Sequence, residues 1–299
     1  MLGAGAMGML FSRVLLDNNC QVTWLVRHML ETHRWASLRS PVLVESEHML
    51  APLRPVLLSD QKNTGEIPYL LVTTKAFDVK RGIARIAHRT TPNTQILLMT
   101  NGLGVREEIE SLLPSATIYN GTTTAGAYRA TPQRTVLTGR GDTRIGHADG
   151  SSSAPDWFAD FASELINPVW SDNIQRDLLM KLAINCAINP LTAVLGCNNG
   201  KLENPKNYPR FCAVCEEIST VLAASGYTDI ASSVFERALA VVRSTANNRS
   251  SMLQDVRAGK KTEIDYITGY LLAMAERQQV PAPHNTRLFK EINARATPH

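Results

Sequence analysis

Three polar residues, Lys181, Asn185 and Asn189, recur at four-residue intervals inside an apolar stretch that ends at Pro190. On an α-helix a step of four residues advances about 400°, so the three side chains fall within a stripe about 80° wide. One cation and two amides are costly to bury without partners. The pattern predicts a helix that presents these groups to a ligand or to polar partners. A solvated helix face is the alternative, although asparagine is a poor helix former.

A second candidate site opens the chain, where Gly3, Gly5 and Gly8 have the spacing G-x-G-x-x-G ahead of an apolar helical pattern. In dinucleotide-binding units these glycines allow a tight turn, a close approach to the pyrophosphate and close helix packing. The N-terminus of the following helix attracts the anion. The glycine spacing is weak evidence by itself, because structural turns also produce it.

The strand-like run 21–27 supports the interpretation of the glycines as a dinucleotide site. It ends about 20 residues after the glycines, at the position where dinucleotide-binding units recognise the ribose of the cofactor. A carboxylate there holds the 2′-hydroxyl of NAD, whereas arginine suits the 2′-phosphate of NADP. The run ends in Arg27, and no acidic residue occurs between Asp17 and Glu31. The sequence therefore predicts NADP(H) as the cofactor. Ordinary surface charge is the alternative for Arg27.

Strand-like runs at 21–27, 69–74 and 95–100 alternate with helical or turn material, which is typical of a parallel, doubly wound sheet. Such sheets bind ligands at the carboxyl ends of their strands. Lys75 and the segment 101–104 follow two of these runs, so both are candidates for cofactor contact. The alternative is that these residues only form turns. A turn explains Gly102 and Gly104 better than it explains Lys75.

The second half of the chain has helical patterns almost throughout. After short strands and turns at 121–146, we expect a helix at 156–165, a strand at 169–170, and the long helix that carries Lys181. Further helices are expected at 209–225, 230–246, 251–258, 263–277 and 286–294. The composition shift near residue 170 predicts two domains, a Rossmann-type NADP-binding domain over 1–170 and an all-α substrate and catalytic domain over 171–299, with the active site in the cleft between them.

Local signals predict where two of these helices begin or end. We expect Asp172 to cap the helix that carries Lys181, and Pro190 to limit or kink it. Thr262 and Glu263 should open the helix 263–277, where the helix dipole favours an acidic residue. Helix capping alone is therefore an alternative explanation of Glu263.

Composition narrows the possible classes of protein. The chain has 299 residues, 44% of them hydrophobic and 19% charged, which is typical of globular proteins. A net charge of +4, with basic residues spread out, does not favour a nucleic-acid partner. We find neither a membrane-length apolar run nor a metal-binding spacing of histidines. Five cysteines in no framework spacing favour a cytoplasmic location, and the C-x-x-C of Cys212 and Cys215 is expected to pack in a helix.

Taken together, these motifs resemble the 2-dehydropantoate 2-reductase (ketopantoate reductase) family, which reduces 2-dehydropantoate to (R)-pantoate with NADPH in pantothenate biosynthesis. The likeness spans nearly the whole chain. It is carried by runs at residues 3–8, 75–76, 101–102, 181–192, 199–200, 250–257 and 262–266. The runs 181–192 and 250–266 are far more specific than the glycine spacing.

The resemblance implies roles for individual residues. Lys181 would be the general acid that protonates the C2 oxygen, and Glu263 would orient Lys181 or touch the nicotinamide ribose. Cofactor contacts are implied for Gly3, Ala4, Gly5, Ala6, Met7, Gly8, Arg27, Lys75, Asn101, Ala127 and Glu263. Substrate contacts are implied for Asn101, Lys181, Asn185, Asn189, Asn199 and Ser251. The chain would be a monomer or a homodimer.

One feature departs from the family pattern: members enter the glycine turn through a full first strand, whereas only Met1 and Leu2 precede Gly3. A short central strand would leave backbone groups on both neighbouring strands without partners. We expect that translation starts upstream; the alternative is a chain that binds NADP poorly and is unstable. Two other functions stay open, reduction of another small 2-keto acid and NADP binding by a regulator without turnover.

Overall fold

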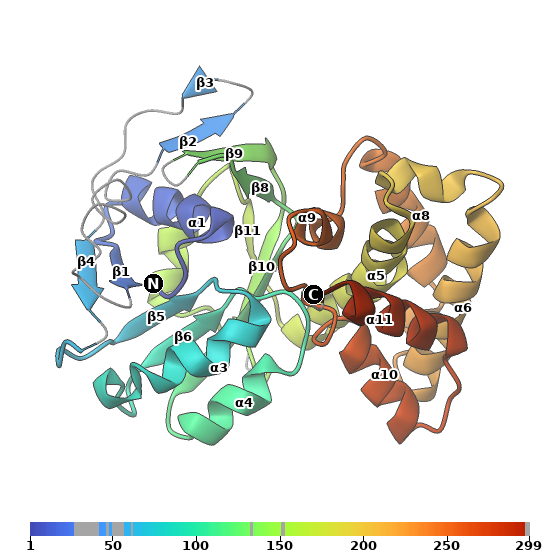
Figure 1. Cartoon of the computed structure of the whole chain (residues 1–299). Helices are drawn as coiled ribbons and strands as arrows, with labels where there is room; N and C mark the ends of the chain where they lie inside the picture. Colours follow the sequence, from blue (N-terminus) through green and yellow to red (C-terminus); the bar gives the residue numbers. More distant parts are fainter. Residues whose placement is uncertain are drawn as a thin grey trace. The chain divides into compact units, whose positions relative to one another are not determined.

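The computed structural model describes residues 1–26, 42–45, 48–49, 57–60, 62–131, 134–150 and 153–296. It divides the chain into two compact units (Figure 1). Unit 1 comprises Met1–Thr100 and Val105–Asp177, and unit 2 comprises Asn101–Gly104 and Leu178–His299. Arg27, the predicted 2′-phosphate ligand, lies outside the described residues.

Unit 1 is built on a five-stranded sheet in the order β11-β10-β7-β6-β5. Its strands are β5 (Tyr69–Val72), β6 (Gln95–Leu98), β7 (Thr117–Thr123), β10 (Thr143–His147) and β11 (Pro168–Trp170). Strands β5, β6 and β7 run parallel, and β10 is antiparallel to β7. Helices α3 (Ala76–Ala84) and α4 (Val105–Leu112) make the two crossovers between the parallel strands (Figure 1). The predicted α/β class with a parallel sheet is thus confirmed.

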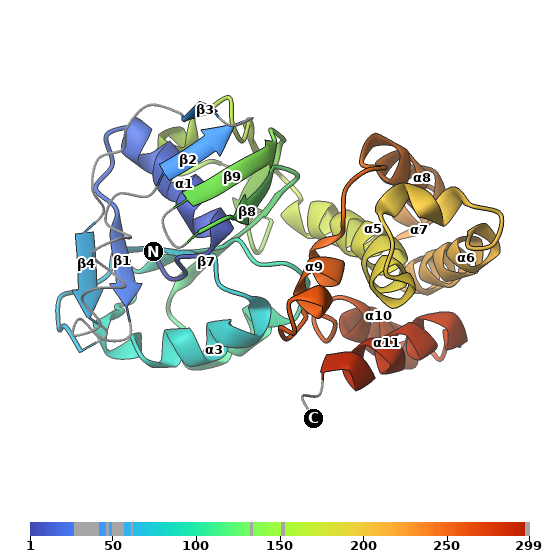
Figure 2. The same cartoon turned by 45° about the horizontal axis from the view of Figure 1, so that its top comes forward.

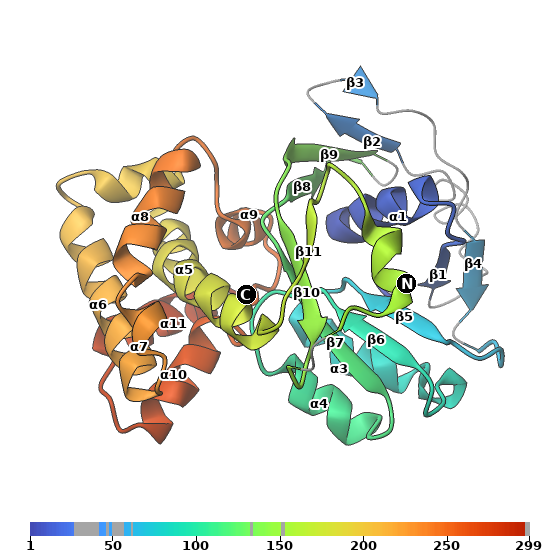
Figure 3. The same cartoon turned by 180° about the vertical axis from the view of Figure 1, so that it is seen from behind.

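The parallel strands are buried on both faces. Leu71, Leu97 and Tyr119 share one core cluster with Leu10 and Phe11 of α1 (Ala6–Asp17). Because successive strand residues point to opposite faces, the alternate residues on these strands pack on the other side. Figure 3 shows the sheet from behind, with α1 away from α3 and α4. The glycine turn that leads into α1 is therefore held by a helix that is itself fixed to the sheet.

Met1 and Leu2 lie between β5 and the two-stranded pair of β1 (Thr23–Val26) and β4 (Leu57–Asp60). Leu2 bridges Val72 in parallel and bonds backbone groups of Leu71 and Thr73 at 2.8 and 2.9 Å. On the other side the terminal ammonium of Met1 donates to the Thr23 carbonyl at 2.6 Å, and burial lowers its pKa to about 5. A cavity of about 730 Å³ lies alongside, lined by both β1 and β5.

A third sheet, in the order β3-β2-β9-β8, packs against α1 (Figure 2). Its strands are β2 (Val42–Glu45), β3 (His48–Met49), β8 (Gly126–Arg129) and β9 (Arg134–Gly139). The Thr135 hydroxyl contacts the Met9 sulfur at 2.8 Å, which marks the face of β9 that looks toward the helix. The helix expected at 156–165 is a shorter 3₁₀ helix, η2 (Asp156–Phe161), and a 3₁₀ turn, η1, covers Ala87–Arg89.

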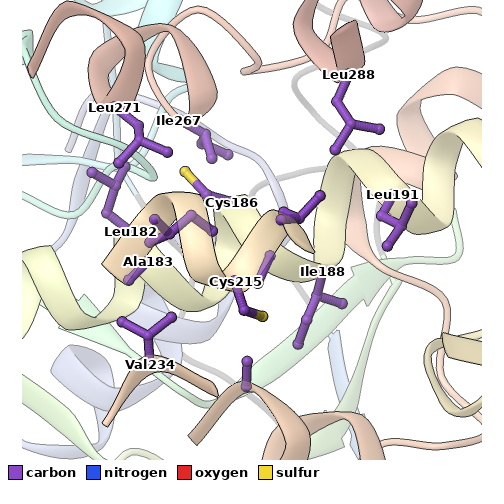
Figure 4. Close-up of a cluster of buried hydrophobic side chains, with 14 of the residues drawn as sticks. Leu182, Ala183, Cys186, Ile188, Leu191, Cys215, Val234, Ile267, Leu271 and Leu288 are labelled. Atoms are coloured by element: carbon purple, nitrogen blue, oxygen red, sulfur yellow. The ribbon is translucent and has the colours of Figure 1, made fainter. Parts of the chain in front are cut away.

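Unit 2 is helical, as predicted. Its elements are α5 (Ile174–Leu195, which begins in unit 1), η3 (Asn199–Glu203), α6 (Tyr208–Ala224), α7 (Thr228–Ala231), α8 (Val234–Ser244), α9 (Ser251–Arg257), α10 (Thr268–Arg277) and α11 (Pro283–Ala296). Helix α5 forms the centre of the core, where Leu182, Cys186 and Leu191 meet residues of α6, α8, α10 and α11 (Figure 4). Cys215 packs in the same core, as expected for the C-x-x-C.

Three predicted helix boundaries in this half are wrong, and of the two effects expected of Pro190 the structure excludes an end of the helix there. Asn173, rather than Asp172, caps α5, because its side-chain oxygen accepts from the Arg176 backbone N–H at 3.2 Å. Helix α5 continues past Pro190 to Leu195, because the core around it stabilises the helix despite one missing N–H donor. The helix expected at 230–246 is split at residues 232–233 into α7 and α8, and residues 263–267 form turns ahead of α10.

Helix α5 also satisfies the length and composition criteria for a membrane span, with a mean hydropathy of 1.6. Sixty-seven per cent of that window is buried inside the protein. Its apolar character is accounted for by the core that surrounds it (Figure 4).

Candidate active site

The glycine turn of unit 1 has the close packing that the spacing predicts. Gly3 has φ +112°, and a Cβ there would lie 2.7 Å from the Thr74 nitrogen. A Cβ on Gly8 would lie 2.0 Å from the Gly3 carbonyl oxygen, so the first turn of α1 packs directly on the loop. The Thr73 hydroxyl donates to the same carbonyl at 2.8 Å. The packing of the turn therefore favours glycine at positions 3 and 8, because any Cβ there would clash.

Gly5 differs from the other two glycines, because a Cβ there would meet no atom within 4 Å. Gly5 is the N-cap of α1, no side chain caps the helix, and its first turn contains no acidic residue. Helix N-termini of this kind bind phosphate groups through their backbone N–H donors. The donor set thus fits the pyrophosphate of a dinucleotide, with Ala4, Ala6 and Met7 completing the turn.

Two further predicted cofactor contacts lie in unit 1. Lys75 is the N-cap of α3 at the carboxyl end of β5, with an extended backbone (φ −60°, ψ 144°). Ala127 lies on β8 and is half-buried. The structure also brings Arg129 to the turn, where its Nη1 donates to the Ala4 carbonyl at 2.9 Å. The sequence gives no signal for this contact, because the two residues are 125 positions apart.

The structure places Lys181 on α5 in unit 2, where it keeps partial solvent exposure. Burial lowers the pKa of its ammonium group to about 8, and the negative charge of Glu263 partly offsets this effect. Glu263 therefore acts electrostatically on Lys181 within unit 2. A lysine with a pKa near neutrality is a better proton donor than an ordinary lysine, and it remains mostly protonated at pH 7.

Glu263 is 4% exposed, and its carboxylate accepts from the side-chain amide of Asn101 at 3.4 Å. The segment Asn101–Gly104 belongs to unit 2 by its contacts, although residues on both sides of it belong to unit 1. The Leu103 N–H donates to the Tyr266 carbonyl at 2.9 Å. Gly102, with φ +82°, packs so closely that a Cβ would lie 2.3 Å from the same oxygen. Backbone pairing thus fixes Asn101 beside Glu263.

The residues predicted to bind substrate also lie in unit 2. Asn185 and Asn189 follow Lys181 on α5, Asn189 being 8% exposed and Asn185 half-buried. Asn199, in η3, is 6% exposed and donates from its amide to the Thr245 hydroxyl at 2.9 Å. Its amide oxygen is buried and has no hydrogen-bond partner among the described residues, which marks a polar position that a ligand donor can satisfy.

Ser251 is the exposed first residue of α9, and a buried hydroxyl pair fixes the start of that helix. The Ser250 hydroxyl accepts from the Leu253 N–H at 3.1 Å. The Thr192 hydroxyl donates to the Ser250 hydroxyl at 2.8 Å. Thr192 and Ser250 lie in the runs 181–192 and 250–257 that carry the resemblance, but the sequence prediction gave neither residue a role of its own. The N-cap pattern ahead of an apolar run was a signal for Ser250, whereas the contact of Thr192 with Ser250 follows only from the fold. Within the described residues, no group of three His, Cys, Asp or Glu side chains is placed to hold a metal ion.

A glycine turn on a parallel sheet, followed by a helical unit, defines a dinucleotide-binding α/β protein with an all-α partner domain. The sequence model of the family described as Ketopantoate reductase PanE/ApbA matches residues 1–150, and that of its C-terminal region matches residues 173–296. The chain belongs to the ketopantoate reductase family.

Curated relatives and solved structures agree with this assignment. The chain is 34% identical to 2-dehydropantoate 2-reductase of Shigella flexneri over 97% of its own length and 92% of the relative's. It is 37% identical to the Vibrio cholerae enzyme, covering 75% of this chain and 76% of the relative. A structure described as a probable 2-dehydropantoate 2-reductase of Bacillus subtilis has a TM-score of 0.82 at 28% identity, covering 98% of both chains. D-mandelate dehydrogenase with NADH and anilino(oxo)acetate has a TM-score of 0.87 at 21% identity, covering 99% of this chain and 98% of that one, which shows a shared fold.

Proposed function

We propose that the protein catalyses the NADPH-dependent reduction of 2-dehydropantoate to (R)-pantoate in pantothenate biosynthesis. Membership of the ketopantoate reductase family supports the reaction. The single observation that carries it in the structure is Lys181, with its pKa lowered to about 8, near the buried carboxylate of Glu263. A keto acid whose carbonyl is to become a hydroxyl needs a proton donor of this kind.

In the proposed mechanism Lys181 is the general acid. A nicotinamide cofactor held at residues 3–8 would supply the hydride that C2 of the keto acid accepts. The ammonium group of Lys181 hydrogen-bonds the C2 oxygen and gives it a proton as negative charge develops there. The carboxylate of Glu263 keeps the pKa of Lys181 from falling further, so that the proton is present at neutral pH. Asn101 holds that carboxylate in place through its amide.

Substrate recognition in this proposal rests on neutral polar groups. Asn185 and Asn189 extend from Lys181 along α5. Asn199 brings a buried amide oxygen that has no partner in the part of the chain that the structure describes. Ser251 brings a hydroxyl at the exposed start of α9. These groups suit a small keto acid that carries a hydroxyl, because a site built to pair such a hydroxyl rejects analogues that lack it.

For the cofactor we propose NADP(H) rather than NAD(H). The glycine turn, with its uncapped helix and the absence of acid in the first turn, supports a dinucleotide pyrophosphate at residues 3–8. Arg27, at the position where NAD-binding units usually carry a carboxylate, supports the 2′-phosphate. Lys75, Asn101, Ala127 and Glu263 complete the proposed cofactor contacts.

We further propose a cytoplasmic protein that acts on a small molecule as a monomer or a homodimer. All five cysteines lie in the described part of the chain and none is paired there, which supports a reducing compartment.

The deciding experiment is NADPH oxidation by the purified chain with 2-dehydropantoate. The panel includes a 2-keto acid of the same branching that lacks the hydroxyl. We expect kcat/KM to be at least about 100-fold higher for 2-dehydropantoate, because unpaired polar groups penalise the analogue. Preference for another 2-keto acid would change the assigned substrate. Binding of NADPH without oxidation by any keto acid would indicate a non-catalytic regulator instead.

A further inference from the structure

Arg129, the last residue of β8, extends its side chain to the glycine turn. Its guanidinium donates from Nη1 to the Ala4 carbonyl at 2.9 Å, within the six residues that are proposed to bind the cofactor. The residue is exposed at the surface of unit 1. A positive charge is therefore held at the turn by a backbone hydrogen bond.

The strand geometry explains why this arginine reaches the turn. Side chains two residues apart on a strand lie on the same face, so Arg129 shares its face with Ala127, another proposed cofactor contact. Arg129 pairs with Thr135 of β9 in antiparallel register, and opposite residues of such a pair also share a face. Thr135 contacts Met9 of α1 at 2.8 Å, so this face of the sheet looks toward the helix that begins at the glycine turn.

The charge balance at the turn favours an anion. The N-terminus of α1 carries the positive end of the helix dipole, has no side-chain cap, and has no acidic residue in its first turn. The guanidinium adds a full positive charge to the same place. A guanidinium pairs with phosphate through charge-assisted hydrogen bonds, so Arg129 can add a side-chain donor to the backbone donors of this helix N-terminus.

We propose that Arg129 binds the pyrophosphate of the dinucleotide cofactor, bridging it to the Ala4 carbonyl of the glycine turn. The inference rests on the proposed function for the presence of a dinucleotide at residues 3–8. The proposal adds Arg129 as a side-chain ligand of the pyrophosphate. Arg129 would bind the pyrophosphate from the side opposite the backbone N–H donors of α1. Because NADPH and NADH share the pyrophosphate, Arg129 should contribute equally to the binding of both.

The test measures dissociation constants of NADPH and NADH by fluorescence titration, without substrate, for the wild type, Arg129→Gln and Arg129→Lys. The matched control is Arg134→Gln, because Arg134 is also an exposed arginine of this sheet but lies one residue from Thr135 and hence on the opposite face. We expect Arg129→Gln to weaken both cofactors about tenfold, as the loss of one charge-assisted hydrogen bond predicts. Arg129→Lys should restore part of the affinity, and Arg134→Gln should change neither constant.

Salt dependence provides a second readout that a purely structural role would not change. The logarithm of the dissociation constant should rise less steeply with salt in Arg129→Gln than in the wild type, because one phosphate contact is lost. Unchanged affinity for both cofactors, or a loss confined to NADPH, would overturn the pyrophosphate assignment while leaving the proposed reaction intact. A wild type that binds neither cofactor would instead refute the proposed function.

Discussion

The side-chain amide of Asn101 donates to the buried carboxylate of Glu263 at 3.4 Å, across 162 positions of sequence. Backbone pairing of Leu103 with Tyr266 fixes the two segments in register. Glu263 in turn acts on the pKa of Lys181. Three residues from three distant segments therefore form one polar group within unit 2, and the first predictions concern how that group works.

Replacing Lys181 with alanine should abolish proton donation without removing the cofactor site. We expect kcat to fall by about 10²–10⁴-fold, the usual contribution of a general acid, while the dissociation constant for NADPH stays near that of the wild type. Lys260→Ala is the matched control, because Lys260 is exposed. Steady-state kinetics and fluorescence titration measure the two effects. Lost NADPH binding with an unchanged kcat would contradict the assigned role.

The pH dependence of kcat/KM should follow the ammonium group of Lys181. Only the protonated form can donate, so activity should be constant well below the pKa and fall as the pH rises through about 8. An ordinary lysine would lose its proton only near pH 10.4. In Glu263→Gln the charge that raises the pKa is gone, so the fall should move to lower pH. A profile of Glu263→Gln that coincides with the wild type in shape would rule out this electrostatic coupling.

The glycine turn offers a pair of substitutions that separates folding from cofactor binding. Gly8→Ala places a Cβ 2.0 Å from the Gly3 carbonyl, so we expect a loss of roughly 1–3 kcal/mol in the free energy of unfolding. Gly5→Ala meets no atom within 4 Å and should leave the melting temperature nearly unchanged while weakening NADPH, because the backbone must approach the pyrophosphate there. Thermal melts and titrations distinguish the two variants. Strong destabilisation by Gly5→Ala would contradict the geometry of the turn.

Cofactor preference should depend on Arg27. Reversing its charge in Arg27→Asp is expected to weaken NADPH about tenfold or more, because a charge-assisted contact to the 2′-phosphate is lost. NADH lacks that phosphate and should be weakened far less. The ratio of the two dissociation constants is the measurement. Equal weakening of both cofactors would remove the argument for the 2′-phosphate.

The N-cap of α9 should matter for both stability and substrate affinity. Ser250→Ala removes the hydroxyl that accepts from the Leu253 N–H, which is expected to cost about 1 kcal/mol in the free energy of unfolding. Because Ser251 is the first residue of that helix, KM for the keto acid should rise as well. Chemical unfolding and steady-state kinetics measure the two effects. Ser251→Ala serves as the comparison, since it should raise KM while leaving the cap intact.

Much of the fold could be predicted because periodic patterns reflect burial. The polar residues Lys181, Asn185 and Asn189 recur with the helical period, and the structure places the apolar residues between them in one core around α5. The predictions that failed depended on side-chain geometry. Asn173 caps α5 instead of Asp172 through one oxygen at 3.2 Å, a distance that no pattern encodes. Pro190 stays inside the helix because tertiary packing outweighs its local preference.

The candidate site was predictable in its residue types but not in its pairings. Spacing and resemblance identified Lys181, Glu263 and Asn101, yet the hydrogen bond between the last two is a property of the tertiary fold. The same holds for Arg129, whose contact with Ala4 arises only when β8 is laid against α1. The roles of these residues in binding and catalysis stay predictions that the experiments above test.

The placement of Asn101–Gly104 with the helical unit has a consequence for how this protein can be divided. A fragment containing only residues 178–299 would include Lys181 and Glu263. It would lack the Asn101 amide, which donates to the Glu263 carboxylate, and Gly102, which packs on the Tyr266 carbonyl. Excising or exchanging the C-terminal half as a self-contained module would therefore leave an incomplete polar group. Chimeras that join halves from different relatives should retain function only when the short loop after β6 is transplanted with the helices.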